Sequence, residues 1–354
     1  MKALILAGGK GTRLRPITFS MAKQLVPVAN KPVIEYGIEA IRKAGITDFG
    51  IIVGDTAEAV EAALGDGSRL GVSITYIPQP EPLGLAHAVK TALPFLGDDD
   101  FIMYLGDNLL KSSIEGLVEE FNIYEPAATI LLTSVPNPQD FGVAELEKGK
   151  VMRLEEKPAK PKSDLALVGV YLFTKQIHDS IAKLKPSPRG EYEITDAIQG
   201  LIDMGLDVRS HIVDGWWKDT GTVEAMLEAN RLILEDVERR IEGEVDDASK
   251  VEGRVVLGKG ARVVNSTIRG PAIIGEGCVI ENAFVGPFTA IDRGSTLRNS
   301  EIEYSIVLEE CCIEDVRARI ECSLIGRGVK VSRTEGKPWN ISLVLGDSSS
   351  IRLT

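Results

Sequence analysis

Two hydrophobic periodicities divide this chain of 354 residues. From residue 1 to about 215, short β-rich runs alternate with segments in which apolar residues recur every three or four positions. This alternation predicts an α/β fold with a mostly parallel sheet covered by helices. The expected strands are Ala3 to Ala7, Phe49 to Val53, Ser73 to Ile77, Phe101 to Leu105, Thr129 to Val135, Val151 to Glu155, Leu165 to Phe173 and Val208 to Val213.

Two of the expected helices have clear end signals. Pro32 can open the first at its initial turn, and an apolar stripe that begins at Val33 continues until Gly45 stops it. The second is expected to run from Thr222, a favourable N-cap, to Ile241, with its apolar residues on one face.

Beyond residue 250 the helix signals vanish and aliphatic residues recur every five or six positions. They are Leu257, Val263, Ile268, Ile274, Ile280, Val285, Ile291, Leu297, Ile302, Leu308 and Ile313. A short fixed period predicts a solenoid, in which each coil buries its aliphatic side chains against the next. The alternative is a β-sandwich, whose strands alternate strictly at period 2 over longer runs. The spacing over residues 251–332 resembles the hexapeptide repeat of the left-handed β-helix, with turns such as Leu257-Gly258-Lys259-Gly260.

Composition narrows the class of protein. Lys and Arg number 40 against 52 Asp and Glu, and the net charge of -12 disfavours nucleic-acid binding. No apolar run is long enough to cross a membrane, and the apolar start is too short for a signal peptide. The four cysteines form no metal-binding pattern. We expect a cytoplasmic protein.

A glycine-rich loop directly follows the first expected strand. Gly8, Gly9 and Gly11 let backbone N–H groups approach an anion, and Arg13 offers a planar fork for phosphate oxygens. The pattern matches neither the dinucleotide fingerprint nor the P-loop. It predicts a triphosphate site, with a tight strand-to-helix turn as the alternative.

Two aspartates are candidate metal ligands. Asp107 follows an apolar strand, at the end of the strand where ligands of α/β sheets lie, and Asp219 occurs in a similar setting. Two carboxylates together with substrate phosphates form a typical Mg²⁺ site. Alternatively, Asp107 forms a turn and Asp219 caps the following helix.

Together, Gly8-Gly9-x-Gly11-Thr12-Arg13-Leu14, Lys23-x-x-x-Pro27-Val28 and Lys31-Pro32 resemble the signature of the sugar-1-phosphate nucleotidylyltransferases. The resemblance implies that Asp107 and Asp219 hold Mg²⁺ and that Arg13 and Lys23 are catalytic contacts to the phosphates. It implies nucleotide binding by Leu6, Gly8, Gly9, Gly11, Thr12, Gln24, Gln79, Gly84 and Asp107. It implies sugar-phosphate binding by Gly142, Glu156, Lys157, Arg189 and Glu191.

Further stretches are similar to the thymidylyltransferase branch, whose members make dTDP-glucose. The segment from Gln79 to Ala86 resembles its base-binding segment, and a glutamine amide can pair with a pyrimidine edge. Two positions depart from the pattern. Leu83 stands where the short enzymes usually have Asp, and Val168 where they often have Thr, so base and sugar preference are left open.

The resemblance implies four segments. They are a Rossmann-like α/β nucleotidyltransferase domain at residues 1–241, a polar linker at 242–250, a left-handed β-helix at 251–335 and a C-terminal tail at 336–354, to which we assign no role. The solenoid is expected to support a homo-oligomer.

The implied reaction is attack of glucose 1-phosphate on the α-phosphorus of dTTP, without a covalent intermediate and with Mg²⁺. It needs no general base, and His87, His178 and His211 are scattered, so we expect them to be structural or surface residues. The same chemistry with UTP or another sugar 1-phosphate is an alternative, as is a silent regulatory or scaffold subunit. A hexapeptide acyltransferase is disfavoured because no histidine follows residue 211.

Overall fold

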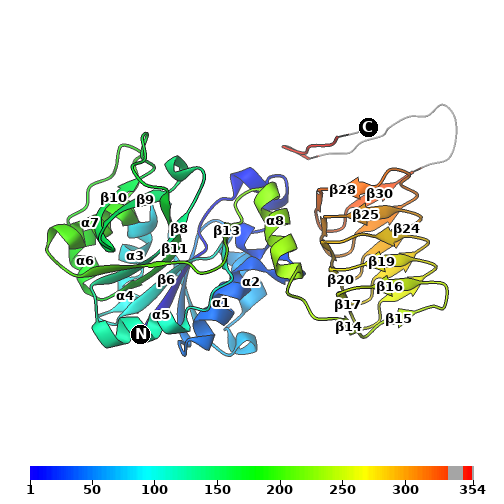
Figure 1. Cartoon of the computed structure of the whole chain (residues 1–354), viewed down its shortest axis with the longest axis horizontal. Coiled ribbons are helices and arrows are strands. Elements are labelled where there is room, and N and C mark those ends of the chain that lie inside the picture. The colour runs from blue at the N-terminus through cyan, green and yellow to red at the C-terminus, as the bar shows by residue number, and fades with distance from the viewer. Residues whose placement is uncertain (334–345, 353–354) are drawn as a thin grey trace. The chain divides into compact units, whose positions relative to one another are not determined.

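The computed structural model describes residues 1–333 and 346–352, and its contacts group the chain into two compact units (Figure 1). The first comprises Met1–Lys10, Met21–Leu25 and Val33–Asp219. The second comprises Gly11–Ser20, Val26–Pro32 and the chain from Thr220 onwards. Of the expected tail, residues 336–345 and 353–354 lie outside the described residues.

A nine-stranded sheet forms the centre of the first unit. Its main path runs β10-β9-β11-β6-β1-β4-β5, and β8 and β12 extend it beyond β11. The strands are β1 (Lys2–Leu6), β4 (Asp48–Val53), β5 (Ser73–Pro78), β6 (Phe101–Leu105), β8 (Ala128–Ser134), β9 (Gly142–Glu147), β10 (Lys150–Glu156), β11 (Leu165–Phe173) and β12 (Val208–Ile212). Every strand expected from the sequence is present, and β9 is an addition.

The sheet is mixed rather than mostly parallel. Strands β5, β4, β1 and β6 are parallel, as expected, whereas β11 is antiparallel to β6, β8 and β9. No α-helix separates β8, β9, β10 and β11 along the chain. Parallel neighbours need a long crossover, so these closely connected strands pair antiparallel.

Two helical layers cover the two faces of this sheet. The helices are α1 (Val33–Lys43), α2 (Ala57–Leu64), α3 (Leu85–Thr91), α4 (Leu93–Leu96), α5 (Glu115–Tyr124), α6 (Gln176–Ile181) and α7 (Ile194–Asp203). Ala3 and Ile5 of β1 share a buried cluster with α1, α2 and α5, while Leu4 and Leu6 share another with α3, α4, α6 and α7. The alternation of side chains along β1 thus supplies both cores.

Short elements complete the α/β part of the chain. They are η1 (Thr12–Leu14), η2 (Ile17–Phe19), η3 (Lys23–Leu25), β2 (Pro27–Val28), β3 (Lys31–Pro32), η4 (Ser68–Leu70), β7 (Asn108–Leu110), η5 (Pro138–Asp140) and β13 (Trp217–Asp219). In the part of the chain that the structure describes, no helix is long and apolar enough to cross a bilayer.

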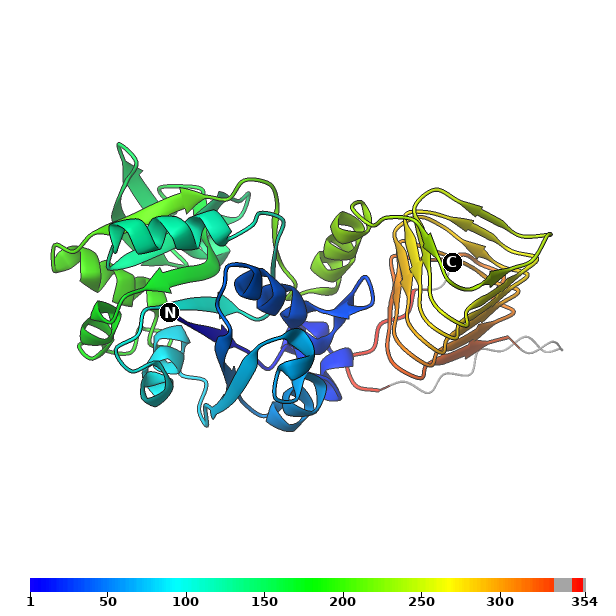
Figure 2. The same cartoon turned by 90° about the horizontal axis from the view of Figure 1, so that it is seen from below.

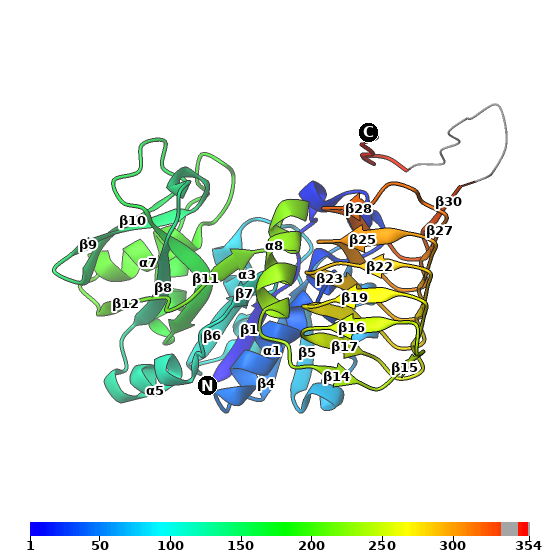
Figure 3. The same ribbon diagram turned by 45° about the vertical axis from the view of Figure 1, so that its right-hand side comes forward.

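The second unit contains a stack of parallel β-coils, as expected for a left-handed β-helix. Three sheets form its sides, and Figure 2 shows the triangular outline of the coils. Val255 pairs with Ala272 and Val263 with Ile280, so one coil here takes 17 residues. The stacked strands are visible in Figure 3, and the aliphatic side chains that set the period form the buried interior.

The solenoid strands are short and fall into the three sheets in turn. The first sheet contains β14 (Arg240–Ile241), β17 (Val255–Leu257), β20 (Ala272–Ile274), β23 (Thr289–Ile291), β26 (Ile306–Val307) and β29 (Leu324–Ile325). The second contains β15 (Glu244–Val245), β18 (Arg262–Val264), β21 (Val279–Glu281), β24 (Thr296–Arg298), β27 (Cys312–Glu314) and β30 (Lys330–Ser332). The third contains β16 (Lys250–Glu252), β19 (Thr267–Arg269), β22 (Phe284–Val285), β25 (Glu301–Glu303) and β28 (Ile320–Glu321).

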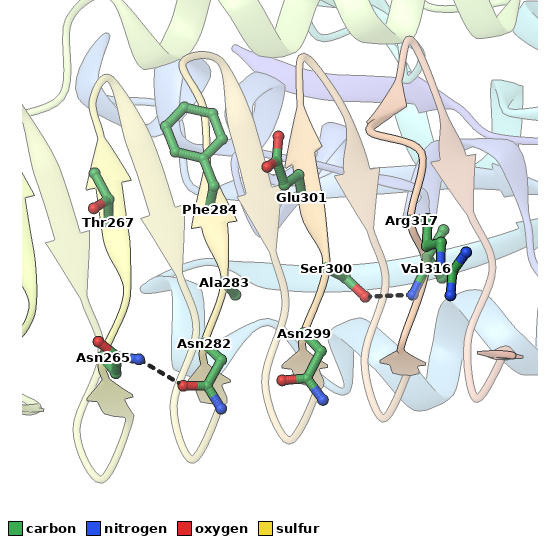
Figure 4. A pocket seen from close by; sticks show the side chains of 10 residues that line it. All are labelled: Asn265, Thr267, Asn282, Ala283, Phe284, Asn299, Ser300, Glu301, Val316 and Arg317. Carbon is green, nitrogen blue, oxygen red and sulfur yellow. Dashed lines mark hydrogen bonds between the residues drawn. The ribbon is translucent and has the colours of Figure 1, made fainter. Parts of the chain in front are cut away.

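Asparagines turn one corner of successive coils. Asn265, Asn282 and Asn299 all have positive φ, a conformation that asparagine tolerates better than most residues. Figure 4 shows them in a row beside a hollow that Phe284 also lines, and Asn265 Nδ2 donates to Asn282 Oδ1 at 2.8 Å. These side chains therefore have a structural explanation in the stacking of the coils.

The helix before the solenoid is shorter than expected. Thr222 is its N-cap, as predicted, with Oγ1 accepting from the Ala225 N–H at 3.2 Å, but α8 (Val223–Leu234) ends seven residues before Ile241. Ile241 already pairs with Leu257 of the next coil. The segment 242–250, expected to be a linker, contains β15 and the start of β16. Its many acidic residues suggested a linker because they occupy exposed positions of the first coil.

Candidate active site

The glycine loop after β1 lies against two of the predicted nucleotide contacts. Leu6 ends the strand in the core, and the chain continues through Gly8 and Gly9. A Cβ atom on Gly8 would lie 3.5 Å from Oε1 of Gln79, and one on Gly9 would lie 3.0 Å from Cε of Lys23. The absence of side chains in the loop therefore lets Lys23 and Gln79 lie directly against its backbone.

Lys23 connects the loop with the first candidate metal ligand. Its ammonium group forms an ion pair with the carboxylate of Asp107, and the two side chains are only 18% and 10% exposed. The neighbouring Gln24 is buried, and its Oε1 has no hydrogen-bond partner within the described residues. Because an unpaired buried amide oxygen is costly, a donor on a bound ligand is a suitable partner for it.

The two candidate metal ligands lie at neighbouring positions of one short ladder. Strand β7 begins at Asn108, directly after Asp107, and pairs antiparallel with β13, which ends at Asp219. In this register Asp219 is opposite Asn108. The fold thus brings together two carboxylates that are far apart in the sequence. Within the described residues there is no group of three or more His, Cys, Asp or Glu side chains that could hold a metal.

Asn108 orients the Asp107 carboxylate. It is buried, its Nδ2 donates to Asp107 Oδ1 at 3.1 Å, and its Oδ1 accepts from Nε1 of Trp217 at 2.5 Å. The hydroxyl of Tyr104 donates to the Asn108 carbonyl at 3.0 Å. This network limits the rotation of the carboxylate, as partners behind a metal ligand commonly do.

The predicted sugar-phosphate residues gather around Glu156. Glu156 is opposite Gly142 in the β9–β10 ladder. Its Oε1 accepts from Arg189 at 3.2 Å, and Arg189 also pairs with Glu191 at 3.3 Å. A Cβ atom on Gly142 would lie 3.0 Å from Oε2 of Glu156, so only glycine leaves this carboxylate its present position. The backbone N–H of Lys157 donates to the Phe141 carbonyl at 3.0 Å, and Lys157 has positive φ.

The predicted base-binding segment also has a fixed geometry. Gln79 Nε2 and His87 Nδ1 are 2.9 Å apart, and the His87 ring stacks on that of Tyr192. Gly84 has φ of +104°, and a Cβ atom there would lie 2.5 Å from the Tyr192 carbonyl oxygen. Gly84 therefore permits the close approach of two backbone segments at the start of α3.

The rest of the glycine loop is grouped with the second unit. Gly11 adopts a left-handed conformation with φ of 59°, and Thr12 and Arg13 lie in the short helix η1 that follows it. Leu14 anchors this helix in the core, whereas Thr12 and Arg13 are exposed. The side chain of Arg13 is thus accessible to a ligand.

Comparisons with known proteins decide the family. The nucleotidyl transferase family matches residues 2–236, which is well over half of the chain. The chain belongs to this family. It is 58% identical over 355 residues to a glucose-1-phosphate thymidylyltransferase of Streptomyces griseus, and the match covers all of both chains. It is 48% identical over 358 residues to a low-salt glycan biosynthesis nucleotidyltransferase of Haloferax volcanii, again with both chains fully covered.

A solved structure is similar to the α/β part alone. It is described as a glucose-1-phosphate thymidylyltransferase from Bacillus anthracis in complex with a sucrose. It is 39% identical, its TM-score is 0.63, and the match covers 68% of this chain and 97% of that one. The resemblance to sugar-1-phosphate nucleotidylyltransferases drawn from the sequence is therefore confirmed, and the chain is an enzyme of the nucleotidyltransferase class.

In this nucleotidyltransferase the protonation of Glu156 is perturbed. Burial raises the pKa of its carboxyl above the usual glutamate range, and the charge of Glu193 raises it further. Lys157, Arg189 and a hydrogen bond from Thr195 oppose this shift of the pKa. A perturbed carboxyl in a group of predicted ligand contacts is typical of a functional site.

Several residues of the site were not singled out from the sequence. Asn108 and Thr195 lay inside motifs that were noticed for their acidic members. His87 was expected to be structural or on the surface, yet it contacts Gln79 at the start of the helix after the base-binding segment. The position of His87, eight residues after Gln79, was the only available signal, because the turn of the chain between them is visible only in the fold.

Proposed function

We propose that the chain transfers a thymidylyl group from dTTP to glucose 1-phosphate, giving dTDP-glucose and pyrophosphate. The observation that carries the proposal is the meeting of the glycine loop, Lys23 and Asp107, with Asp219 one position away. The full-length similarity to a glucose-1-phosphate thymidylyltransferase supports this substrate pair.

Charge neutralisation is the main task of these residues. The reaction joins two anions, because an oxygen of the sugar phosphate attacks the α-phosphorus in line and pyrophosphate leaves. Lys23 and Arg13 supply positive charge to the triphosphate, and the backbone of Gly8, Gly9 and Gly11 approaches it closely, with Leu6 and Thr12 at the loop's two ends. Such positioning and electrostatic stabilisation need no covalent intermediate and no general base.

The neighbouring carboxylates fit a divalent cation. Asp107 and Asp219 offer hard oxygen atoms, and Mg²⁺ is commonly bound by one or two carboxylates together with substrate phosphates. We assign these two residues as its ligands. When bound, the ion supplies positive charge that stabilises the phosphates in the transition state. Asn108 keeps the Asp107 carboxylate in a defined orientation toward it.

The group around Glu156 is suited to a sugar phosphate. Lys157 and Arg189 are cations for the phosphate, and Glu156 and Glu191 can accept hydrogen bonds from sugar hydroxyls. Gly142 leaves the space in which Glu156 lies. The base is assigned to the other group, where Gln79, Gly84 and Gln24 offer amide and backbone contacts.

Sugar-phosphate binding should depend on pH through Glu156. Because the pKa of this carboxyl is raised, it takes up its proton at a higher pH than an ordinary glutamate. The ionised form is the better acceptor, so KM for glucose 1-phosphate should rise as the pH falls from 7 to 5. Glucose 1-phosphate itself titrates in this range, so the wild-type profile is compared with that of Glu156→Gln. The variant should lose the part of the pH dependence due to Glu156, and identical profiles would contradict the role.

The nucleotide and the sugar are the least certain parts of the specificity because Leu83 and Val168 depart from the thymidylyltransferase pattern. The same chemistry with UTP or another sugar 1-phosphate is the second candidate. Thymine and uracil differ by one methyl group, worth only about 1 kcal/mol or a fewfold preference.

Pyrophosphate release across a panel of substrates tests the proposal. The nucleotides are dTTP, UTP and dCTP, and the sugars are the 1-phosphates of glucose, galactose and N-acetylglucosamine. We expect the highest kcat/KM with dTTP and glucose 1-phosphate. A higher value with UTP, or with another sugar, would replace the proposed pair, and no release with any pair would favour a regulatory or scaffold subunit.

We also propose that the protein acts in the cytoplasm as a homo-oligomer. The solenoid ends and sides present surfaces through which copies can associate. The substrates are small molecules, and the net charge of -12 does not favour nucleic acid.

A further inference from the structure

A short hairpin follows the segment that carries Lys23. Strands β2 (Pro27–Val28) and β3 (Lys31–Pro32) pair antiparallel, and the turn between them is Ala29 and Asn30. Both turn residues have positive φ, 50° and 59°, which is unfavourable for a side chain with a Cβ atom. Such a turn persists only where its surroundings hold it.

Two asparagines hold this turn. Asn230 of α8 is completely buried, and its Oδ1 accepts from the backbone N–H of Ala29 at 2.9 Å. Its Nδ2 donates to the carbonyl of Phe288 in the solenoid at 2.9 Å. Asn30 Nδ2 donates to the carbonyl of Ile291 in the same coil at 2.8 Å. The tip of the hairpin is therefore bonded to one coil, once directly and once through Asn230.

The position of Asn230 is unusual for a polar residue. It lies on the buried side of α8 beside Met226, Leu227 and Ala229. A buried amide is costly unless its donor and its acceptor are both paired, and both are paired here. An apolar residue would pack equally well on the solenoid but would leave the Ala29 N–H without this acceptor. The asparagine thus serves the hairpin and not only the packing of the helix.

The hairpin is joined to the catalytic segment by very little chain. Helix η3 (Lys23–Leu25) ends two residues before Pro27, and α1 begins at Val33, directly after Pro32. Few backbone torsions therefore separate the held turn from Lys23, whose ammonium group lies against Gly9 and Asp107.

We infer that Asn230 is a positioning residue of the nucleotidyl transfer reaction: through the hairpin at residues 27–32 it fixes the backbone from which Lys23 reaches the triphosphate. The solenoid thereby contributes to catalysis without touching a substrate. This inference rests on the role proposed for Lys23.

A simple docking role for α8 is the alternative, and the chain offers a matched control. The Tyr304 hydroxyl donates to Glu228 Oε2 of the same helix at 3.1 Å, and this bond does not involve the hairpin. Tyr304→Phe keeps the ring and removes only that bond. It should leave kcat and KM within about twofold of the wild type, as expected for a partly exposed hydrogen bond.

Kinetics of the full-length chain test the inference. Asn230→Ala should lower kcat/KM for dTTP by about tenfold, the scale seen when a residue that orients a ligating group is lost. Asn30→Ala, which removes one bond at the turn without opening a cavity under α8, should act in the same direction. It keeps the test available if Asn230→Ala does not fold.

A double-mutant cycle separates positioning from stability. The affinity for dTTP with Mg²⁺ is measured by calorimetry in the wild type, Lys23→Ala, Asn230→Ala and the double variant. If Asn230 acts through Lys23, Asn230→Ala should weaken binding in the wild type and have little further effect once Lys23 is absent.

Three outcomes would overturn the inference. The effect of Asn230→Ala could add fully to that of Lys23→Ala, or both asparagine variants could match Tyr304→Phe in kcat/KM while only their melting temperatures fall. In either case the role of Lys23 would stand. If Lys23→Ala alone left activity and affinity unchanged, the role of Lys23 and this inference would both be wrong.

Discussion

Replacing Asp107 by Asn is expected to reduce kcat by roughly 10³-fold or more, because charge stabilisation in the transition state is the main source of rate in such a reaction. The carboxylate is the partner of Lys23, accepts from Asn108 and lies next to Asp219 across the β7–β13 ladder. Its loss would therefore affect both the cation and the metal site. The amide has the same shape, so the fold should be retained.

Two further measurements make this prediction specific. The Mg²⁺ concentration for half-maximal activity should rise in Asp107→Asn, while the melting temperature without ligand should stay close to that of the wild type. Asp98→Asn is a matched control, because Asp98 is exposed and pairs only loosely with Lys175 at 3.8 Å. Near-normal turnover of Asp107→Asn would remove this residue from the proposed metal site.

Replacing Arg13 by Ala should also have a large effect, a fall in kcat of about 10²- to 10³-fold, the usual consequence of removing one charged donor to a developing anion. The exposed guanidinium follows the left-handed Gly11, and buried Leu14 fixes the short helix that carries it. Arg13→Lys should recover only part of the activity, since an ammonium group lacks the planar fork that binds two phosphate oxygens.

Arg15→Ala is the control for Arg13. Both arginines are exposed in the same loop, but the Arg15 guanidinium lies 4.8 Å from the centre of the Phe19 ring. Its loss should change stability slightly and catalysis little. Equal effects of the two substitutions would show that the general charge of the loop, rather than a specific contact of Arg13, assists the reaction.

The sequence predicted elements well where one local signal sufficed. Alternating runs such as Leu165 to Phe173 gave strands at the expected residues, and the five- to six-residue aliphatic period gave the solenoid. The mixed sheet was not predicted, because strand direction depends on how the chain crosses between strands. The end of α8 at Leu234 was also missed, since the apolar Val237 and Ile241 fit a helical stripe as well as the start of a coil.

The candidate site shows the same division. Its charged and glycine residues could be read from motifs, and the fold brings Lys23, Asp107 and Asp219 together. The uncharged residues that orient them could not. Asn108, His87 and Asn230 act through amide or ring atoms whose partners are distant in sequence, and no local pattern distinguishes such residues from ordinary polar ones.

The repeat of the solenoid also constrains how this chain can vary in length. Val255 and Ala272 occupy equivalent positions of successive coils, 17 residues apart. An insertion or deletion of one whole coil keeps every inward side chain inward, whereas a change of a single residue rotates all later positions out of phase. Descendants of this protein can therefore gain or lose height in whole storeys, while the coil that holds Phe288 and Ile291 must remain.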